Sequence, residues 1–173
     1  MSTSSARAWF LLTSKPHKDE LAHTQLLNQG YEVYRPLAKR LKKRNGKMIR
    51  TVESLFPRYL FIHLDNGIND NWTSIRYTYG VSDFVRFGKQ SLPKPVPNHI
   101  IANLQDQEET LGERLIDLER FHKGDQVLIK DGPYKNLLAI FQQYEGEQRV
   151  MLLLNLLHTE TRLTTDTINI ERY

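Results

Sequence analysis

Hydrophobic and polar positions alternate along the first part of the chain in a way that predicts a strand followed by a helix. An apolar run of strand length covers residues 8–13. Residues 18–29 follow, with Ala22 and Leu26 at helical spacing, and Gly30 is a helix stop signal. We therefore expect the chain to open with a strand and a helix that share one hydrophobic core.

A β-hairpin is expected after this helix. Strand character resumes over residues 31–41, and the dipeptide Asn45-Gly46 separates two runs rich in Lys and Arg. Asn-Gly favours the positive φ angles of a two-residue hairpin turn. The basic residues from Arg40 to Arg50 therefore lie at a hairpin tip, which we interpret as a solvated surface, with a DNA-facing element as the alternative.

The middle of the chain continues this mixed pattern. Residues 54–64 are aromatic and β-branched enough for a central strand, and residues 66–71 are typical of a turn. A turn and a short strand are expected over 80–88, and a helix from Pro97-Asn98 to about residue 109. The mixed order of strands and helices predicts an α+β domain that ends near residue 108.

The last part of the chain gives two conflicting signals. Val127 and Ile129 alternate with polar residues and lead into Asp131-Gly132, a strand and tight turn typical of a small β-barrel. The Leu-rich runs over 137–141 and 150–157 also fit two helices, and periodicity alone does not distinguish the two structures. Such a conflict between local signals is typical of a switching element.

Charge is distributed unevenly along the chain. Residues 1–60 contain 12 Lys and Arg against 4 Asp and Glu, whereas residues 61–173 contain 12 against 16. A basic first domain favours an anionic partner, because a field of one sign concentrates polyanions near it. An ordinary solvated basic face is the alternative interpretation.

The residue types present argue against several kinds of site. The chain has no Cys, so it has neither disulfides nor thiolate metal sites, and its His residues do not fall at metal-ligand spacing. No Ser-His-Asp order, phosphate-binding Gly loop or carboxylate pair indicates an enzyme. The longest apolar run is far short of the roughly 20 residues that span a bilayer, and no signal peptide is seen. We expect a cytoplasmic protein without enzymatic activity, metal, cofactor or membrane contact.

Three collinear segments resemble the NusG family of transcription elongation factors. Residues 55–61 and 80–88 are similar to its N-terminal domain, and residues 124–134 to its C-terminal KOW motif. Residues 84–88 and 151–156 further resemble the specialised, RfaH-like branch of the family. The resemblance runs from about Trp9 to the C-terminus, and three collinear motifs spread over that length are more specific than an isolated KOW-like turn.

This resemblance implies a domain plan. Residues 1–108 correspond to a NusG-type domain of the α+β class, an antiparallel sheet flanked by helices that binds polymerase and DNA, and residues 109–121 to a linker. Residues 122–173 correspond to a KOW-type domain, which in RfaH-like members is either an α-helical hairpin or a five-stranded β-barrel. The hairpin masks the polymerase site, and we expect it in the full-length chain.

The function that the resemblance implies is operon-specific transcription elongation and antitermination. Such a monomeric protein binds the β′ clamp helices of RNA polymerase and the β gate loop, is recruited by the non-template DNA strand and suppresses pausing. Its released barrel binds ribosomal protein S10. The alternatives are a general NusG-type factor and a ribosome- or RNA-binding KOW protein. The latter predicts a basic C-terminal unit, whereas residues 121–173 contain 6 Lys and Arg against 7 Asp and Glu.

The resemblance also implies residues for each contact. Those implied for the polymerase clamp are aromatic, with ordinary core packing as the alternative: Phe56, Tyr59, Phe61 and Phe87. Those implied for the gate loop replace a His-Thr-Thr triad: Asn71, Trp72 and Thr73. Those implied for DNA are basic or polar, and Gln25 and Tyr79 replace a His and an Arg of the best-known members: Lys15, Lys18, Gln25, Arg76, Thr78 and Tyr79.

A final group of residues is implied to hold the C-terminal unit against the N-terminal domain. It consists of a salt bridge and apolar contacts: Glu53, Arg149, Ile140, Phe141, Leu153 and Leu156. We expect the Glu53–Arg149 pair to be exposed, so that it contributes about 0–1 kcal/mol and the apolar contacts supply most of the stability.

Overall fold

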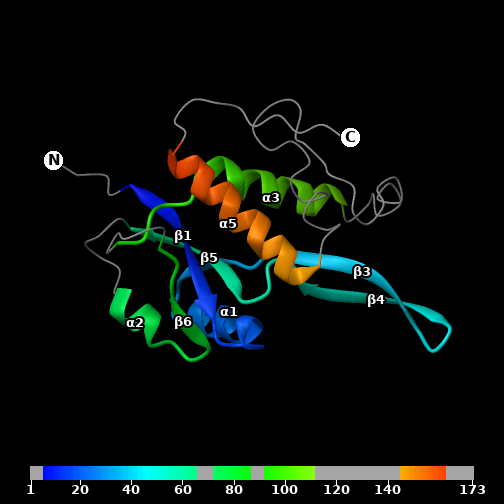
Figure 1. The fold of residues 1–173 in the computed structure, drawn as a ribbon. Coiled ribbons are helices and arrows are strands. Elements are labelled where there is room, and N and C mark those ends of the chain that lie inside the picture. Colours follow the sequence, from blue (N-terminus) through cyan, green and yellow to red (C-terminus); the bar gives the residue numbers. More distant parts are fainter. Residues whose placement is uncertain (1–5, 66–71, 87–91, 112–144, 163–173) are drawn as a thin grey trace. The chain divides into compact units, whose positions relative to one another are not determined.

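The fold is taken from a computed structural model of the chain, which describes residues 6–65, 72–86, 92–111 and 145–162 (Figure 1). Strands and helices are both present, and every strand pair is antiparallel. The predicted α+β class with an antiparallel sheet is therefore confirmed.

Residue contacts divide the chain into two compact units. The first unit consists of Met1–Arg35 and Pro57–Asn98, and the second of Pro36–Phe56 and His99–Tyr173. The second unit thus combines an N-terminal segment with C-terminal residues. The predicted linker, residues 109–121, falls almost wholly outside the described residues, so the predicted domain boundaries stay a prediction.

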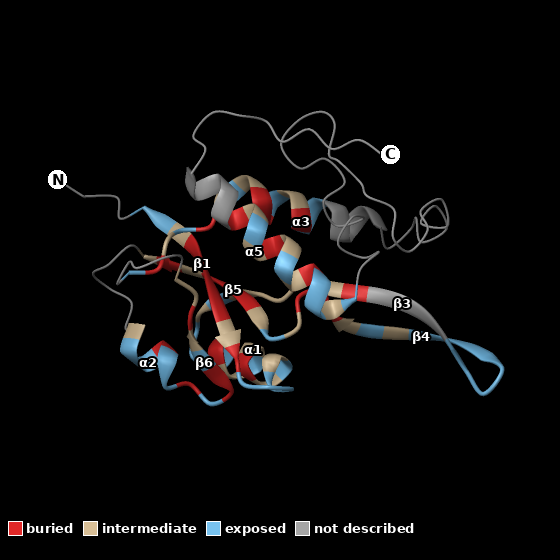
Figure 2. Ribbon diagram, viewed as in Figure 1, coloured by how far each residue is buried: buried red, intermediate tan, exposed pale blue. Residues whose placement is uncertain are grey.

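The first unit is built on a four-stranded antiparallel sheet with the order β2-β5-β1-β6. Its strands are β1 (Arg7–Ser14), β2 (Glu32–Tyr34), β5 (Tyr59–Asp65) and β6 (Val81–Phe84). The predicted central strand over residues 54–64 begins only at Tyr59, because Arg58 has a φ of 71°, which an extended strand does not allow. Figure 2 shows that buried residues concentrate on β1 and β5, the two central strands.

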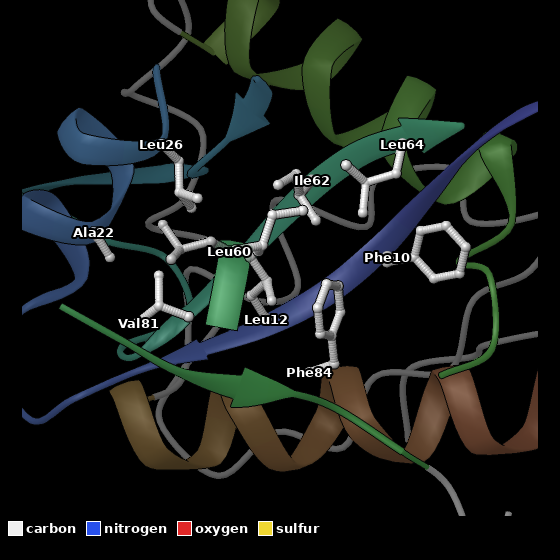
Figure 3. Close-up of a cluster of buried hydrophobic side chains, with 10 residues drawn as sticks. Phe10, Leu12, Ala22, Leu26, Leu60, Ile62, Leu64, Val81 and Phe84 are labelled. Atoms are coloured by element: carbon white, nitrogen blue, oxygen red, sulfur yellow. The ribbon is translucent and has the colours of Figure 1, made fainter. Parts of the chain in front are cut away.

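A hydrophobic cluster joins this sheet to helix α1 (Asp19–Asn28), as Figure 3 shows. Ala22 and Leu26 lie one turn apart on α1 and are fully buried, as their spacing predicts. After the helix, Gly30 adopts a φ of 89°, which confirms it as the stop residue. The cluster consists of Phe10, Leu12, Ala22, Leu26, Leu60, Ile62, Leu64, Ile75, Val81 and Phe84.

Helix α2 (Trp72–Arg76) is an element that the sequence pattern did not predict. It is five residues long, too short for an apolar periodicity, and buries Ile75 in the cluster. The indole of Trp72 packs edge-on against Phe10 and stacks on Phe84, with ring centroids 4.8 and 4.7 Å apart. Short elements of this kind are fixed by tertiary packing rather than by local propensity.

The second unit contains the predicted hairpin, formed by β3 (Leu37–Arg44) and β4 (Lys47–Ser54). Asn45 and Gly46 have φ angles of 50° and 77°, as a two-residue turn of the primed type requires. The register runs without a shift from Leu37 opposite Ser54 to Arg44 opposite Lys47. The Asn-Gly prediction is confirmed.

Two helices complete the described part of the second unit. Helix α3 (Asn98–Leu111) buries the predicted residues Ile100, Ile101 and Leu104. Helix α5 (Gly146–Arg162) covers the second Leu-rich run, so the helical alternative holds for that run. The first run, over 137–141, and the KOW-like motif lie outside the described residues. Among the helices of the described residues, none is long and apolar enough to cross a membrane.

Candidate binding surfaces

The turn between α2 and β6 brings several of the residues implied for DNA binding together within the first unit. The chain leaves β1 at Lys15, whose backbone N–H donates a 2.8 Å hydrogen bond to the carbonyl of Gly80. This bond places the segment containing Lys15 and Lys18 beside the turn containing Thr78 and Tyr79. Both lysines and Tyr79 are exposed, so cations and an aromatic ring share one surface.

Gly80 makes this close approach possible. Its φ is 92°, and a Cβ at this position would lie 3.0 Å from the backbone nitrogen of Ala22 and 3.2 Å from the carbonyl oxygen of Lys18. Any side chain would therefore push the turn away from α1. The glycine sets the distance between the two halves of the candidate DNA surface.

Thr78 lies in the same turn but is buried, and its hydroxyl is already engaged within the protein. The hydroxyl donates to the carbonyl of Ser74 at 3.1 Å and accepts from the Gln29 side chain at 2.9 Å. Thr78 thus connects the end of α1 to the end of α2. A DNA contact by Thr78 stays a prediction. Gln25, which lies on α1, is half-buried.

Tyr77 is a surface residue that the sequence analysis missed. Its side chain is 85% exposed and that of Tyr79 is 68% exposed, on either side of the buried Thr78. Two exposed aromatic rings this close to lysines are suited to stacking with nucleic-acid bases. The sequence signal that could have found Tyr77 is the Tyr-Thr-Tyr pattern of residues 77–79, in which two aromatic residues flank a polar one.

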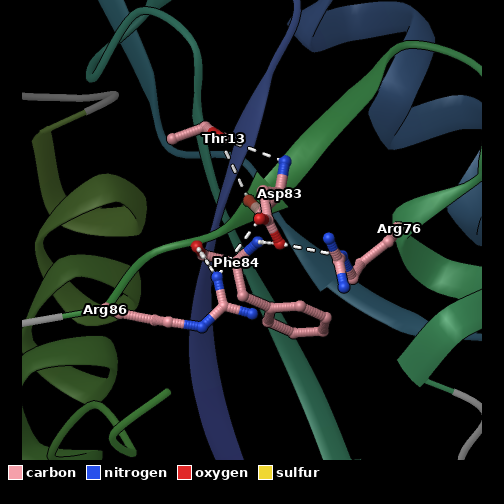
Figure 4. Close-up of polar contacts among 5 residues, drawn as sticks. All are labelled: Thr13, Arg76, Asp83, Phe84 and Arg86. Atoms are coloured by element: carbon pink, nitrogen blue, oxygen red, sulfur yellow. Dashed lines mark hydrogen bonds and ion pairs between the residues drawn. The ribbon is translucent and has the colours of Figure 1, made fainter. Parts of the chain in front are cut away.

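Arg76 is held in place by a carboxylate, as Figure 4 shows. The Arg76 Nε lies 3.1 Å from Asp83 Oδ1, and Arg86 Nη1 lies 3.1 Å from Asp83 Oδ2. On the neighbouring strand β1, the hydroxyl of Thr13 donates to the Asp83 carbonyl at 3.1 Å. Asp83 therefore fixes two guanidinium groups at one edge of the sheet.

The electrostatics of Asp83 follow from these contacts. Partial burial opposes ionisation, but the Phe84 N–H bond and the charges of Arg86 and Arg76 outweigh it and lower the pKa of the Asp83 carboxyl. The ionised form is the one that accepts from both arginines. An anionic ligand for Arg76 would have to compete with this carboxylate.

The aromatic residues implied for the polymerase clamp are mostly buried. Phe61 on β5 is fully buried and its ring stacks on that of Tyr34, with centroids 6.2 Å apart. Phe56 is also fully buried and belongs to the second unit, while Tyr59 is half-buried. Phe87 lies outside the described residues. A clamp contact through Phe56 or Phe61 therefore requires an exposure that this state of the chain does not provide.

The three residues implied for the gate loop differ in their environments. Trp72 is anchored between Phe10 and Phe84 by its ring contacts, so it supports the core. Thr73 is exposed and available for contact. Asn71 lies outside the described residues.

The implied salt bridge between Glu53 and Arg149 is present within the second unit. Arg149 Nη2 donates to Glu53 Oε1 at 3.2 Å, and the same guanidinium donates to the carbonyls of Leu55 and Ser54 at 2.5 and 3.3 Å. The expectation of an exposed pair was wrong, because the Arg149 side chain is only 1% exposed. Arg149 reaches backbone acceptors beyond Glu53, so it is buried with its charge compensated.

The apolar residues implied for the same contact are partly described. Leu153 is fully buried and Leu156 half-buried on α5. Ile140 and Phe141 lie outside the described residues. The role of the whole group in holding the C-terminal unit stays a prediction. Among the described residues, no cluster of three or more His, Asp or Glu could hold a metal ion.

Comparisons with known proteins identify the family. Residues 7–105 match the sequence profile of a family described as "Transcription termination factor nusG". Relatives from the Staphylococcus aureus strains Mu50 and N315, both named "Transcription termination/antitermination protein NusG", are 27% identical over 179 aligned residues and share 96% of each chain. A solved structure described as "Domain interaction in Thermotoga maritima NusG" has a TM-score of 0.43 at 19% identity, covering 75% of this chain and 76% of that one.

The profile match covers more than half of the chain, and it spans most of the first unit and the part of the second unit up to residue 105. The chain belongs to the NusG family of transcription termination and antitermination factors.

Proposed function

We propose that this protein is an operon-specific elongation and antitermination factor of the RfaH-like type. Residues 1–108 bind the β′ clamp helices of RNA polymerase, and an element of the non-template DNA strand recruits the protein, which then suppresses pausing. Residues 122–173 refold on release into a KOW barrel that binds ribosomal protein S10 in the cytoplasm. The nearest alternative is a general NusG-type factor, whose binding to polymerase needs no DNA signal.

The helical state of residues 146–162 carries this proposal. A KOW barrel would need strands in this part of the chain, whereas α5 is a continuous helix of 17 residues. Its buried Arg149 bonds to Glu53, Ser54 and Leu55 of the N-terminal segment. A C-terminal helix fastened to residues 53–55 supports an autoinhibited state, because its release requires these bonds to break.

The turn around Gly80 supports recruitment by single-stranded DNA. Lys15 and Lys18 can neutralise phosphates, and the exposed rings of Tyr77 and Tyr79 can stack with splayed bases. Arg76 adds a third cation that Asp83 orients.

A second polymerase contact, with the β gate loop, is supported by Thr73, because its side chain is exposed.

Binding of the full-length chain to core RNA polymerase without DNA tests the proposal. If the factor is targeted, the wild-type chain is expected to bind polymerase weakly. The Glu53→Ala variant is expected to bind about tenfold or more tightly, because destabilising the closed state by about 1.4 kcal/mol shifts the equilibrium between closed and open states tenfold. Far-UV circular dichroism should show less helix in the same variant as α5 is released.

Glu147→Ala is the matched control, because Glu147 is an exposed glutamate on α5, the helix that carries Arg149. It is expected to bind polymerase as weakly as wild type. A general factor predicts strong and equal binding by wild type and both variants. That result would exclude the autoinhibited, operon-specific role while leaving family membership intact.

A further inference from the structure

Three chain segments meet at one end of the first unit's sheet, where β1 ends and β5 and β6 begin. The backbone N–H of Ser14 donates a 2.8 Å hydrogen bond to the carbonyl of Arg58, and the N–H of Lys15 donates one of 2.8 Å to the carbonyl of Gly80. Arg58 is exposed, as Lys15 is. The residue before β5 therefore brings a further cationic side chain next to Lys15 and to the turn that contains Tyr79.

Arg58 holds a backbone conformation that arginine rarely adopts. Its φ of 71° lies in the left-handed region, which few non-glycine residues occupy and which glycine and asparagine enter most readily. Residues held in such sparsely populated conformations cluster at binding sites. Glycine would serve the backbone here without strain, so the presence of arginine points to a use for its side chain.

The guanidinium of Arg58 is anchored through one nitrogen and open at the other two. Its Nε donates to the carbonyl of Ser14 at 3.1 Å, and Ser14 is fully buried, so the sheet fixes this acceptor. Within the part of the chain that the structure describes, no carboxylate pairs with Arg58, whereas Arg76 and Arg86 both bind Asp83. An anion that binds Arg58 therefore displaces no acidic side chain, and the two Nη groups form the planar fork that holds a phosphate through two hydrogen bonds.

We propose that Arg58 binds a backbone phosphate of single-stranded DNA through its two Nη groups and thereby extends the candidate DNA surface to the start of β5. The inference rests on the proposed recruitment by the non-template strand and adds a contact outside the residues that the family resemblance implies. Phosphate contacts position a strand without reading its sequence. Arg58 and Lys15 therefore hold the backbone, while the rings of Tyr77 and Tyr79 are left to stack on bases.

Fluorescence anisotropy of the full-length chain with a labelled pool of random single strands of about 12 nucleotides tests the proposal. A random pool suffices because a phosphate contact carries no sequence information. Arg58→Gln is expected to weaken binding about tenfold, through the loss of one charge-assisted contact. Over a series of salt concentrations, the slope of log affinity against log salt should become about 0.7 less steep, the value for one phosphate contact to a single strand.

Two further variants separate the fork of N–H groups from the charge and from the backbone. Arg58→Lys keeps the charge but loses the fork, so the salt slope should stay as in wild type while the affinity falls several-fold. Arg58→Gly accepts a φ of 71° without strain, so it should match Arg58→Gln in DNA binding and keep the wild-type circular dichroism spectrum. A loss shared by the glutamine and glycine variants cannot come from damage to the turn.

Arg7→Gln is the matched control. Arg7 is an exposed arginine at the other end of β1, and it also donates one hydrogen bond to a main-chain carbonyl, that of His63, at 3.1 Å. Its replacement removes the same charge from the first unit. It is expected to leave both the affinity and the salt slope unchanged.

The phosphate contact is wrong if Arg58→Gln keeps the wild-type slope or if Arg7→Gln changes it equally. Wild-type affinity in Arg58→Lys would overturn the two-bond geometry. Loss of RNA polymerase binding at unchanged DNA affinity would assign Arg58 to a polymerase contact beside Tyr59 instead.

Lys15→Gln/Lys18→Gln tests the proposed recruitment surface separately. If this variant binds DNA as wild type while Arg58→Gln does not, the recruitment surface fails and the Arg58 contact stands. If it loses affinity while Arg58→Gln binds as wild type, the Arg58 contact alone fails. No measurable binding by the wild-type chain would overturn both.

Discussion

The guanidinium of Arg149 donates a 3.2 Å hydrogen bond to the carboxylate of Glu53, joining a helix to the end of a strand 96 positions earlier in the chain. Arg149 is almost fully buried, and Glu53 is 34% exposed. The carbonyls of Ser54 and Leu55 also accept hydrogen bonds from the guanidinium. Removing a partner of a buried, charge-compensated cation strongly destabilises the folded protein, whereas removing a partner of an exposed ion pair has little effect.

Replacing Arg149 by methionine should loosen α5. Arg149→Met keeps an apolar chain of similar length but leaves the carbonyls of Ser54 and Leu55 without this donor, which costs about 1–3 kcal/mol. Hydrogen exchange of the α5 amides should speed up accordingly, whereas Glu147→Met, a change at an exposed neighbour, should leave exchange unaltered. Equal exchange in both variants would mean that the buried contact does not hold the helix.

Gly80→Ala should destabilise the first unit by about 1–3 kcal/mol, because a φ of 92° and the Ala22 backbone both oppose a side chain there. Urea denaturation of the full-length chain measures the loss. Gly30→Ala is the control, since Gly30 has a similar φ of 89° but nothing within 4 Å of the added carbon. If both variants lose the same stability, backbone strain alone accounts for the effect and the close approach is unimportant.

Thr78→Val should cost about 1–3 kcal/mol, because the buried hydroxyl that bonds to Ser74 and Gln29 is lost at nearly constant volume. A double-mutant cycle with Gln29→Ala isolates the side-chain bond. We expect a coupling free energy of about 0.5–1.5 kcal/mol from urea denaturation. Strict additivity of the two changes would show that Thr78 does not connect the two helices through Gln29.

Acid should weaken the first unit partly through Asp83. The Asp83 pKa is lowered from its ordinary 3.8, against partial burial, by the Phe84 N–H and by Arg86 and Arg76. Because the pKa is lower in the folded state, the carboxylate stabilises the fold above about pH 4, and this contribution is lost as the pH falls through the folded-state pKa. Asp83→Asn should therefore lose less stability than wild type between about pH 5 and pH 2. Parallel acid titrations of the two proteins would contradict this.

Tyr79→Ala should weaken binding of single-stranded DNA, because stacking of one base on an aromatic side chain contributes about 1–3 kcal/mol, or roughly 5- to 150-fold in affinity. Anisotropy of a labelled single strand measures it. Leu92→Ala, at another exposed residue of the first unit, serves as the control and should bind as wild type. A Tyr79 variant that binds like this control would remove the ring from the candidate DNA surface.

The sequence predicted those parts of the fold in which local and tertiary signals agree. Asn45-Gly46 specified the hairpin turn because few dipeptides adopt two positive φ angles, and Ala22 and Leu26 specified the buried face of α1. Helix α2 escaped prediction because its position depends on Trp72 packing between Phe10 and Phe84, which are distant in sequence. Such contacts leave no local period to read.

The candidate site was predicted less completely than the fold. The resemblance found the Glu53–Arg149 pair but not its burial, since the acceptors at Ser54 and Leu55 are backbone atoms without a sequence signature. Asp83 was missed for the opposite reason, because a lone carboxylate in a short strand gives no hint that two arginines converge on it. Tyr77 was missed because exposure of an aromatic residue in a turn is decided by its buried neighbour, Thr78.

The acceptors around Arg149 have a consequence for how this protein tolerates mutation. The acceptors at Ser54 and Leu55 are main-chain oxygens, which every residue type supplies, so replacements at positions 54 and 55 that fit the available space leave them intact. The acceptor at position 53, by contrast, is a carboxylate and depends on a particular side chain. Neutral drift can therefore alter much of the strand end without freeing the helix, whereas the donor at position 149 has no substitute with the same reach and fork of N–H groups.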